Sequence, residues 1–282
     1  MPPVLDVDAA LASSAAMAID VQFSPAVEPW PVLRDAVLTA QDRGFSTAWT
    51  FDHFAGEMLG GSTMIECFTL LGALAAVTDR IGLGSLVVNV ANREPGVTVQ
   101  CAAAVHEVSD GRFVLGLGAG AAPGSRWAAE HAALGLALAP TIEERHGRVG
   151  ATLDAADRWW GADRAEEVAT FPLPRPRPPV ILGVNSVRLA ELAGRRADGI
   201  NVRGDHARLD VFLDAADAAR AASDRTHLPW DCSVWAMWDE RLLDPGDPRR
   251  LGWAAAGVNR LVLVWLAPHD PLALARARVT AA

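Results

Sequence analysis

Two short glycine-containing turns are the segments of this sequence best suited to bind an anion. They are the turn Gly118, Ala119, Gly120 and the turn Gly183, Val184, Asn185, Ser186. Both can aim backbone N–H groups at one anion, and the second leads directly into a predicted helix N-terminus, where phosphate binds well. The alternative is that these glycines only relieve crowding where strands turn outward. Two such turns on neighbouring strands favour a phosphate site.

His53 is the candidate for proton transfer, because imidazole is the side chain that changes charge near neutral pH. Its neighbour Asp52 supplies an acceptor that could fix the tautomer of the ring, so both are candidate catalytic residues. A histidine beside a carboxylate is as often a structural pair, and only the place of His53 after a predicted strand favours catalysis. Arg93 has two open interpretations: it holds an anionic substituent, or it is a solvated or capping arginine.

Several other kinds of chemistry are excluded by residue types and spacing. The sequence has no Lys and no Tyr, which removes Schiff-base lysine chemistry and a catalytic tyrosine. No His or carboxylate cluster has metal-ligand spacing, so no metal site is expected. Cys67, Cys101 and Cys232 are scattered among apolar residues and are predicted to be buried thiols. The stretch Gly116-x-Gly118-x-x-Ala121 is a weak dinucleotide motif, because no helix follows it directly.

Composition limits the class of protein. The 282 residues are 51% hydrophobic and carry a formal charge of −9, which is enough apolar material for a full core and no field for nucleic acid. No basic leader precedes an apolar run, and no apolar run reaches the roughly 18 residues that a membrane span needs. These features predict a soluble, cytoplasmic protein that binds neither nucleic acid nor membranes.

The elements that must position these residues alternate between strand and helix. Buried apolar runs predict strands at residues 18–22, 47–51, 81–90, 113–118, 180–182, 199–202, 232–238 and 260–265. Helical spacing and two capping boxes, Thr63 with Glu66 and Thr141 with Glu144, predict helices between them. Eight parallel strands with helical crossovers indicate an α/β fold, a (β/α)₈ TIM barrel, rather than an open doubly wound sheet. In such a barrel the residues after each strand carry the chemistry.

The sequence also predicts the domain organisation of the chain and its assembly. Residues 1–16 lack periodicity and are predicted to be a loose extension, and residues 17–282 a single barrel domain that includes the proline-rich linker 161–178. Ten tryptophans, including Trp159, Trp160 and Trp253 on the outer helices, predict a helix-mediated homodimer. The alternative is that these rings pack within the outer layer of helices.

Four sequence blocks in this order resemble the luciferase-like monooxygenase superfamily, whose barrels bind reduced flavin or the deazaflavin coenzyme F420. The blocks are residues 43–54 (RGFSTAWTFDHF), 80–87 (RIGLGSLV), 109–120 (SDGRFVLGLGAG), and 178–186 (PPVILGVNS) followed by 197–201 (ADGIN). The likeness covers roughly residues 18–267. It implies the bacterial luciferase-like form of the TIM barrel.

The resemblance also implies site roles. The cofactor phosphate would lie on the turns at residues 118–120 and 183–186, and the ring against Leu86, Val87 and Asn89, often beside a bulge or a non-prolyl cis peptide bond. His53 matches a histidine that acts as acid or base in some F420 members. Three positions depart from the family pattern: Ala121 replaces an acidic residue of the sugar-phosphate dehydrogenases, Val184 replaces a common glycine, and residues 92–95 (NREP) replace an aromatic-Arg-His-Pro segment.

The function expected from these observations is hydride transfer between coenzyme F420 and a small organic substrate, with His53 moving a proton. One alternative is a monooxygenase that uses reduced FMN and oxygen, which would share the same phosphate site. A second is a barrel that binds a flavin without catalysis. The sequence does not separate the three.

Overall fold

The computed structural model describes the chain except residues 1–6, 165, 267–269, 278 and 280–282. Its centre is a closed barrel in which the strands follow one another in sequence order. All neighbouring strands are parallel, including the pair that closes the ring. The strands are β1 (Ala18–Phe23), β2 (Thr47–Thr50), β3 (Gly82–Asn89), β4 (Phe113–Gly118), β5 (Val180–Gly183), β6 (Gly199–Arg203), β7 (Asp231–Met237) and β8 (Arg260–Trp265).

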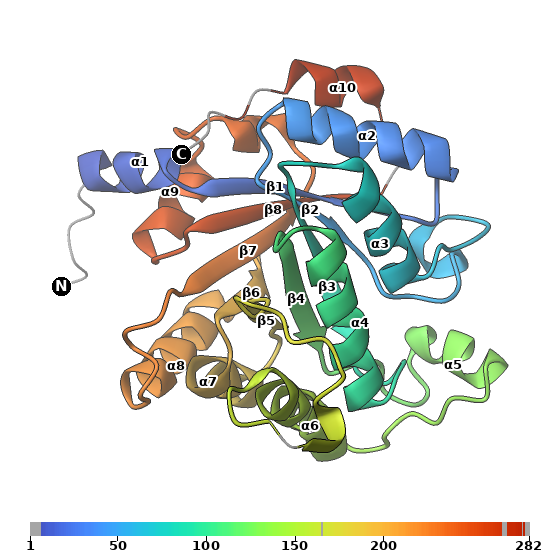
Figure 1. The fold of residues 1–282 in the computed structure, drawn as a ribbon. Helices are drawn as coiled ribbons and strands as arrows, with labels where there is room; N and C mark the ends of the chain where they lie inside the picture. Colours follow the sequence, from blue (N-terminus) through green and yellow to red (C-terminus); the bar gives the residue numbers. More distant parts are fainter. Residues whose placement is uncertain (1–6, 165, 267–269, 278, 280–282) are drawn as a thin grey trace.

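Helices surround this ring and cover its outer face (Figure 1). They are α1 (Val7–Ala15), α2 (Trp30–Asp42), α3 (Cys67–Val77), α4 (Pro95–Val108), α5 (Ala129–Ala133), α6 (Ile142–Trp160), α7 (Val187–Arg196), α8 (Leu209–Ala221), α9 (Pro248–Ala255) and α10 (Pro271–Arg276). Short 3₁₀ turns are η1 (Glu57–Leu59), η2 (Arg126–Ala128), η3 (Glu166–Val168) and η4 (Glu240–Leu243). The predicted (β/α)₈ barrel is confirmed.

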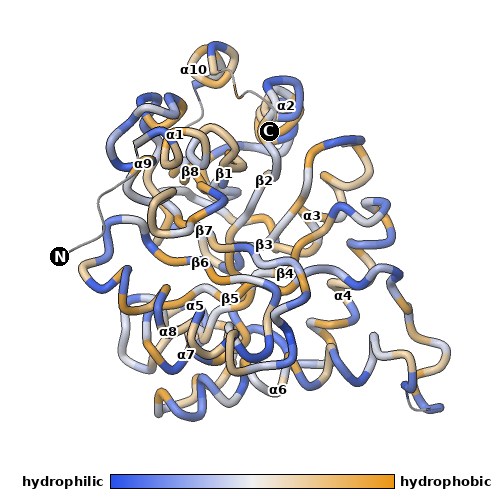
Figure 2. The backbone as a smooth tube through the Cα atoms, turned by 90° about the vertical axis from the view of Figure 1, so that its left-hand side faces the viewer, coloured by the Kyte–Doolittle hydropathy of each residue, from blue (hydrophilic) through white to orange (hydrophobic). Residues whose placement is uncertain are grey.

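The strands are buried on both faces, as their nearly continuous apolar runs require. The main core lies between the strands and the helices, and a separate cluster of Trp49, Leu86, Ile181 and Val262 joins four strands from around the ring. Residues from strands so far apart in the ring can meet only inside it, so this cluster fills the barrel. Figure 2 shows hydrophobic residues along the central strands and hydrophilic residues in the surrounding turns.

A buried group of charges lies where β1 and β8 meet. The Asp20 carboxylate is fully buried and accepts hydrogen bonds from Trp49 Nε1 and from Arg260 Nη1, both at 2.7 Å. Arg260 Nε also donates to Asp231 on β7 at 2.6 Å. Burial raises the pKa of Asp20 although Arg260 opposes the shift. These contacts join β1, β2, β7 and β8.

The prediction that residues 1–16 form a loose extension is wrong for residues 7–15, which form α1 and pack against α9. Ser14 is fully buried, and its hydroxyl donates to the Pro245 carbonyl at 2.8 Å. The buried Arg250 of α9 donates to the Ser14 carbonyl at the end of α1. A helix terminus leaves such carbonyls without partners inside the helix, so a buried guanidinium can hold it in place.

Two further expectations need correction. The helix predicted to begin at Thr63 begins at Cys67, because Glu66 is itself the cap and accepts from the Thr69 amide at 2.7 Å. The tryptophans that suggested a dimer are not exposed. Trp160 and Trp253 are buried and Trp159 packs on Phe171 of the linker, with 5.0 Å between ring centroids. The homodimer therefore loses that support and stays a prediction.

Among the described helices, none combines the length and the apolar character needed to cross a membrane.

Candidate active site

One cavity of about 510 Å³ opens at the carboxyl ends of the strands and brings the predicted site residues together. It is lined by all of the candidate residues except Ser186: Asp52, His53, Leu86, Val87, Asn89, Gly118, Ala119, Gly120, Gly183, Val184 and Asn185. The strand ends of a TIM barrel converge here, so residues distant in sequence share one space. Among the described residues, no group of three or more His, Cys, Asp or Glu side chains is arranged to hold a metal.

The two glycine turns present free amides to this cavity. Within the described part of the chain, the amides of Ala119, Gly120 and Asn185 donate to no other residue. The Val184 amide is not available, because it donates to the Asn201 carbonyl at 2.8 Å. Ser186 lies behind the turn as the N-cap of α7, where its hydroxyl accepts from Leu189 at 3.3 Å. Free amides beside a helix N-terminus fit the phosphate of a nucleotide-like cofactor.

The glycines of these turns also relieve crowding, as the alternative interpretation proposed. A Cβ on Gly118 would lie 2.3 Å from Val87 Cγ2, and one on Gly183 would lie 2.7 Å from Val87 Cγ1. Gly120 has a backbone φ of +76°, a value that residues other than glycine rarely adopt. The same glycines therefore let Val87 sit between β4 and β5 and leave the turns open.

The wall formed by β3 has the irregular backbone that the family resemblance implied. The Leu86–Val87 peptide bond is cis, and the register with β4 shifts between Ser85 and Val88. The Gln22 side-chain amide, from β1, donates to the Leu86 carbonyl. Gln22 and Leu86 both line the cavity, so this wall is held from inside the barrel.

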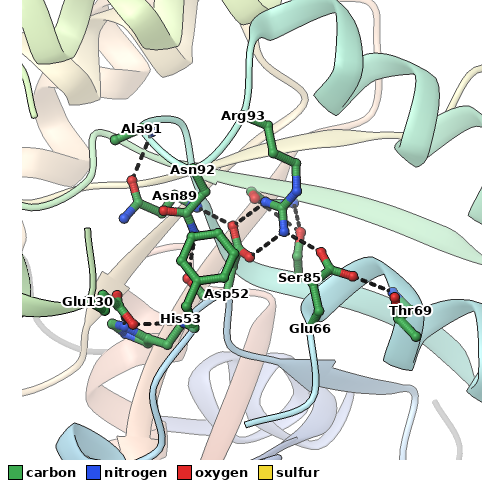
Figure 3. A network of polar contacts seen from close by, with 12 residues as sticks. Asp52, His53, Glu66, Thr69, Ser85, Asn89, Ala91, Asn92, Arg93 and Glu130 are labelled. Atoms are coloured by element: carbon green, nitrogen blue, oxygen red, sulfur yellow. Dashed lines mark hydrogen bonds and ion pairs between the residues drawn. The ribbon is translucent and has the colours of Figure 1, made fainter. Parts of the chain in front are cut away.

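Asp52 is paired with Arg93 and not with His53, so the expected Asp52–His53 pair is wrong (Figure 3). Arg93 donates to both carboxylate oxygens at 2.7 and 2.9 Å, and Asp52 also accepts from the Asn89 amide at 3.0 Å. Arg93 contacts Glu66 as well. Burial would lower the pKa of Arg93, but the hydrogen bonds and charges of Asp52 and Glu66 raise it. Both earlier interpretations of Arg93 are replaced by a buried cation that ties the end of β2 to the end of β3.

The partner of His53 is Glu130, at the start of α5. Its Oε1 lies 2.8 Å from His53 Nδ1 (Figure 3). Its Oε2 accepts from the backbone amides of Phe54 and Ala55 at 2.7 and 3.0 Å. Burial would raise the pKa of Glu130, but these three hydrogen bonds hold it below its usual value. His53 lines the cavity and Glu130 does not.

The connection between β4 and α6 supplies one more side of the cavity. Trp127 lies against His53 with 5.1 Å between ring centroids, and the Arg126 guanidinium lies 4.3 Å from the Trp127 centroid. Phe51, Leu59, Trp235, Met237, Val264 and Leu266 add an apolar lining.

Sequence reasoning missed Glu130, Trp127 and Gln22. Glu130 and Trp127 lie in a connection without periodicity, and nothing in the local sequence shows that it folds back over the strand ends. Gln22 was assigned only to a strand. The one available signal is a polar residue inside an otherwise apolar strand.

Comparisons with known proteins agree with this geometry. A family model described as luciferase-like monooxygenase matches residues 11–237. An F420-dependent glucose-6-phosphate dehydrogenase of Microbacterium testaceum is 28% identical over 207 residues, which cover 69% of this chain and 60% of that protein. A 5,10-methylenetetrahydromethanopterin reductase of Methanolobus tindarius is 26% identical over 224 residues, covering 74% and 61%. The chain thus spans about 60% of the length of these curated relatives.

Solved structures share the fold at low identity. An F420-dependent secondary alcohol dehydrogenase in complex with an F420-acetone adduct aligns with a TM-score of 0.72 and 14% identity, over 92% of this chain and 96% of that one. The monooxygenase RslO1 from Streptomyces bottropensis aligns with a TM-score of 0.68 and 17% identity, over 93% and 96%.

Proposed function

Because the chain belongs to the luciferase-like monooxygenase family, we propose that it is an oxidoreductase that transfers a hydride between coenzyme F420 and a small organic substrate. The observation that carries this proposal is a single cavity lined by two turns with free amides, by the Leu86–Val87 wall and by His53. The choice of F420 over FMN rests on relatives named as F420-dependent enzymes.

Each part of the cavity has a proposed role. The amides of Ala119, Gly120 and Asn185 would hold the cofactor phosphate, and α7 would add the positive end of its dipole. Leu86 and Val87 would face the ring system. When bound, the deazaflavin supplies the carbon that accepts or gives up the hydride.

His53 is the proposed proton-transferring residue. It lies in the cavity wall with one ring nitrogen bonded to Glu130, which leaves the other nitrogen for a substrate. Asp52 is buried against Arg93, so we propose it as a support for the strand ends and not as a reacting group. Asn89 is the proposed link between that support and the cofactor, since it lines the cavity and its backbone N–H donates to the Asp52 carboxylate.

Cofactor titration tests the proposal directly. The protein is titrated with F420 and FMN, each oxidised and reduced, and binding is followed by fluorescence. Tight binding of F420 and weak binding of FMN supports the proposal. Preference for reduced FMN, with oxygen consumption, contradicts it in favour of the monooxygenase. Binding of either cofactor without turnover on a panel of alcohols, aldehydes and ketones points to the non-catalytic barrel.

The role of His53 has its own test. His53→Ala should lower turnover by about 10²-fold or more with F420 affinity nearly unchanged, because a general acid or base acts on the chemical step. His227→Ala is the matched control, since His227 is exposed. Turnover that survives in His53→Ala while its melting temperature falls would assign His53 a structural role.

A further inference from the structure

Glu130 is a buried carboxylate placed directly behind the proposed proton-transferring group. Its side chain is 4% exposed, and every hydrogen bond it accepts comes from the segment that begins with His53. One oxygen contacts the imidazole, and the other accepts two consecutive backbone amides. This arrangement fixes the direction of the carboxylate as well as its distance from the ring.

The helix that carries Glu130 is held at a second point. The next residue, His131, is also buried, and its Nε2 lies 2.8 Å from Asn92 Oδ1 and 3.2 Å from Asn89 Nδ2. Glu130 is therefore attached to the end of β2 and His131 to the end of β3. Two attachments to the rigid barrel limit movement of the carboxylate relative to His53.

The protonation states follow from these contacts. Three donated hydrogen bonds hold the pKa of Glu130 below its usual value, although burial opposes this, so Glu130 is ionised at neutral pH. An ionised carboxylate only accepts hydrogen bonds. The hydrogen in the His53–Glu130 contact must therefore be on Nδ1, and Nε2 is the nitrogen left for the cavity.

The charged groups near His53 either oppose or favour a positive charge on its ring. Arg126 lies over Trp127, which packs against His53, and its positive charge opposes one on the imidazole. The neighbouring Asp52 is matched by Arg93 and adds little net charge. Among the described residues, Glu130 is the carboxylate in direct contact with His53, at 2.8 Å, so it is the group placed to offset a positive charge that the ring acquires when it takes up a proton.

We propose that Glu130 is a positioning residue that holds His53 as the Nδ1–H tautomer and stabilises its protonated form during proton transfer. This role rests on the proposed function. His53 Nε2 would take the proton that the substrate releases when it gives up a hydride, which the cofactor would accept. In the reverse direction the imidazolium returns that proton to the substrate.

Glu130→Gln separates positioning from a purely structural role. Its amide oxygen can still accept from the Phe54 and Ala55 amides, but its NH₂ group would face Nδ1. That contact favours a hydrogen on Nε2 and inverts the tautomer. Glu130→Asp keeps the negative charge but places the carboxylate farther from the His53 ring, because the Asp side chain is one methylene shorter. Glu107→Gln is the control, because Glu107 is exposed.

Three measurements give the expected result. First, ¹⁵N NMR of the cofactor-free protein should show Nδ1–H on His53 in the wild type and Nε2–H in Glu130→Gln, with the His53 signals assigned by their absence from His53→Gln. Second, Glu130→Gln should lower kcat at least about tenfold with KM for F420 within about twofold. Third, Glu130→Asp should restore part of both changes, because it returns a negative charge to the Nδ1 side of the ring.

The NMR result is independent of the cofactor, so it distinguishes failure of this inference from failure of the proposed function. A wild-type His53 with its hydrogen on Nε2 overturns the inference even if F420 is the cofactor. A Glu130→Gln variant that is folded and keeps both the Nδ1–H tautomer and the wild-type kcat also overturns it. If F420 does not bind but the tautomer is Nδ1–H and inverts in Glu130→Gln, the inference on positioning holds and the proposed function fails.

Discussion

Removing the guanidinium of Arg93 should destabilise the protein strongly, because it leaves a fully buried carboxylate without its cation. In Arg93→Met, Asp52 keeps only the Asn89 amide and loses two hydrogen bonds of 2.7 and 2.9 Å. The Asp52 side chain is 0% exposed and that of Arg93 is 11% exposed, so the carboxylate depends on this cation to balance its buried charge.

The size of the effect follows from this burial. Breaking a buried ion pair by removing one partner costs about 3–5 kcal/mol. At roughly 2–4 °C per kcal/mol for a domain of this size, the melting temperature should fall by about 6–20 °C. The Glu66 contact adds little to this value, because the Glu66 side chain is 37% exposed and also caps α3.

A double-mutant cycle measured by urea and thermal unfolding tests this reasoning. Asp52→Asn in the Arg93→Met background should restore stability, because a buried neutral amide costs less than a buried unpaired charge. Arg80→Met is the control, since Arg80 is 62% exposed and its partners Asp42 and Asp79 are exposed as well. The reasoning is refuted if Arg93→Met lies within about 1 kcal/mol of wild type, or if the double variant is no more stable than Arg93→Met.

Two other outcomes are expected. Gly84→Ala should destabilise the barrel by about 1–3 kcal/mol or more, because the new Cβ would lie 2.3 Å from the buried Trp49 ring. In Gly72→Ala the new Cβ meets no atom within 4 Å, so this change in helix α3 should be neutral or stabilising. Equal unfolding free energies for the two variants would contradict this prediction. The pKa of Glu130 in the folded protein lies below its ordinary value of 4.5, so its charge stabilises the fold above pH 4.5 and this contribution is lost as the pH falls through the folded-state pKa. The Gln variant keeps neutral hydrogen bonds to the Phe54 and Ala55 amides, so wild type should be more stable by about 1 kcal/mol at pH 7. The difference in unfolding free energy, measured with urea, should shrink below pH 4.5; a difference independent of pH would count against the charged contact.

The parts of the fold that could be predicted from sequence are the buried strands, because each is a run of contiguous apolar residues. Strands β4 and β8 begin and end where the apolar runs predict, because a parallel strand buried on both faces has little freedom in composition. Helix α1 was missed because its Ala/Ser-rich sequence has no apolar stripe, and its position depends on Arg250, which is distant in sequence. Its stability is tertiary, which local patterns do not show.

In the site, too, the contiguous segments could be predicted and the contacts between distant residues could not. The glycine turns are contiguous segments, so their residue types alone indicated an anion site. The partner of His53 could not be predicted, because Glu130 is 77 residues away and reaches it through an aperiodic connection. Asp52 is adjacent to His53 in sequence, but it points to Arg93 because a buried carboxylate gains more from a bidentate cation than from an imidazole.

The charged group at the seam of the barrel places a condition on how the chain assembles. Asp20 and Arg260 are 240 positions apart, so during synthesis the first strand exists long before its counter-charge does. Until β8 forms, Asp20 lacks its cation, and burying β1 at that stage would leave the carboxylate with only the hydrogen bond from Trp49 Nε1. The ring is therefore completed by electrostatic pairing as well as by backbone hydrogen bonds, and we expect a nascent chain that ends before β8 to keep Asp20 in contact with water.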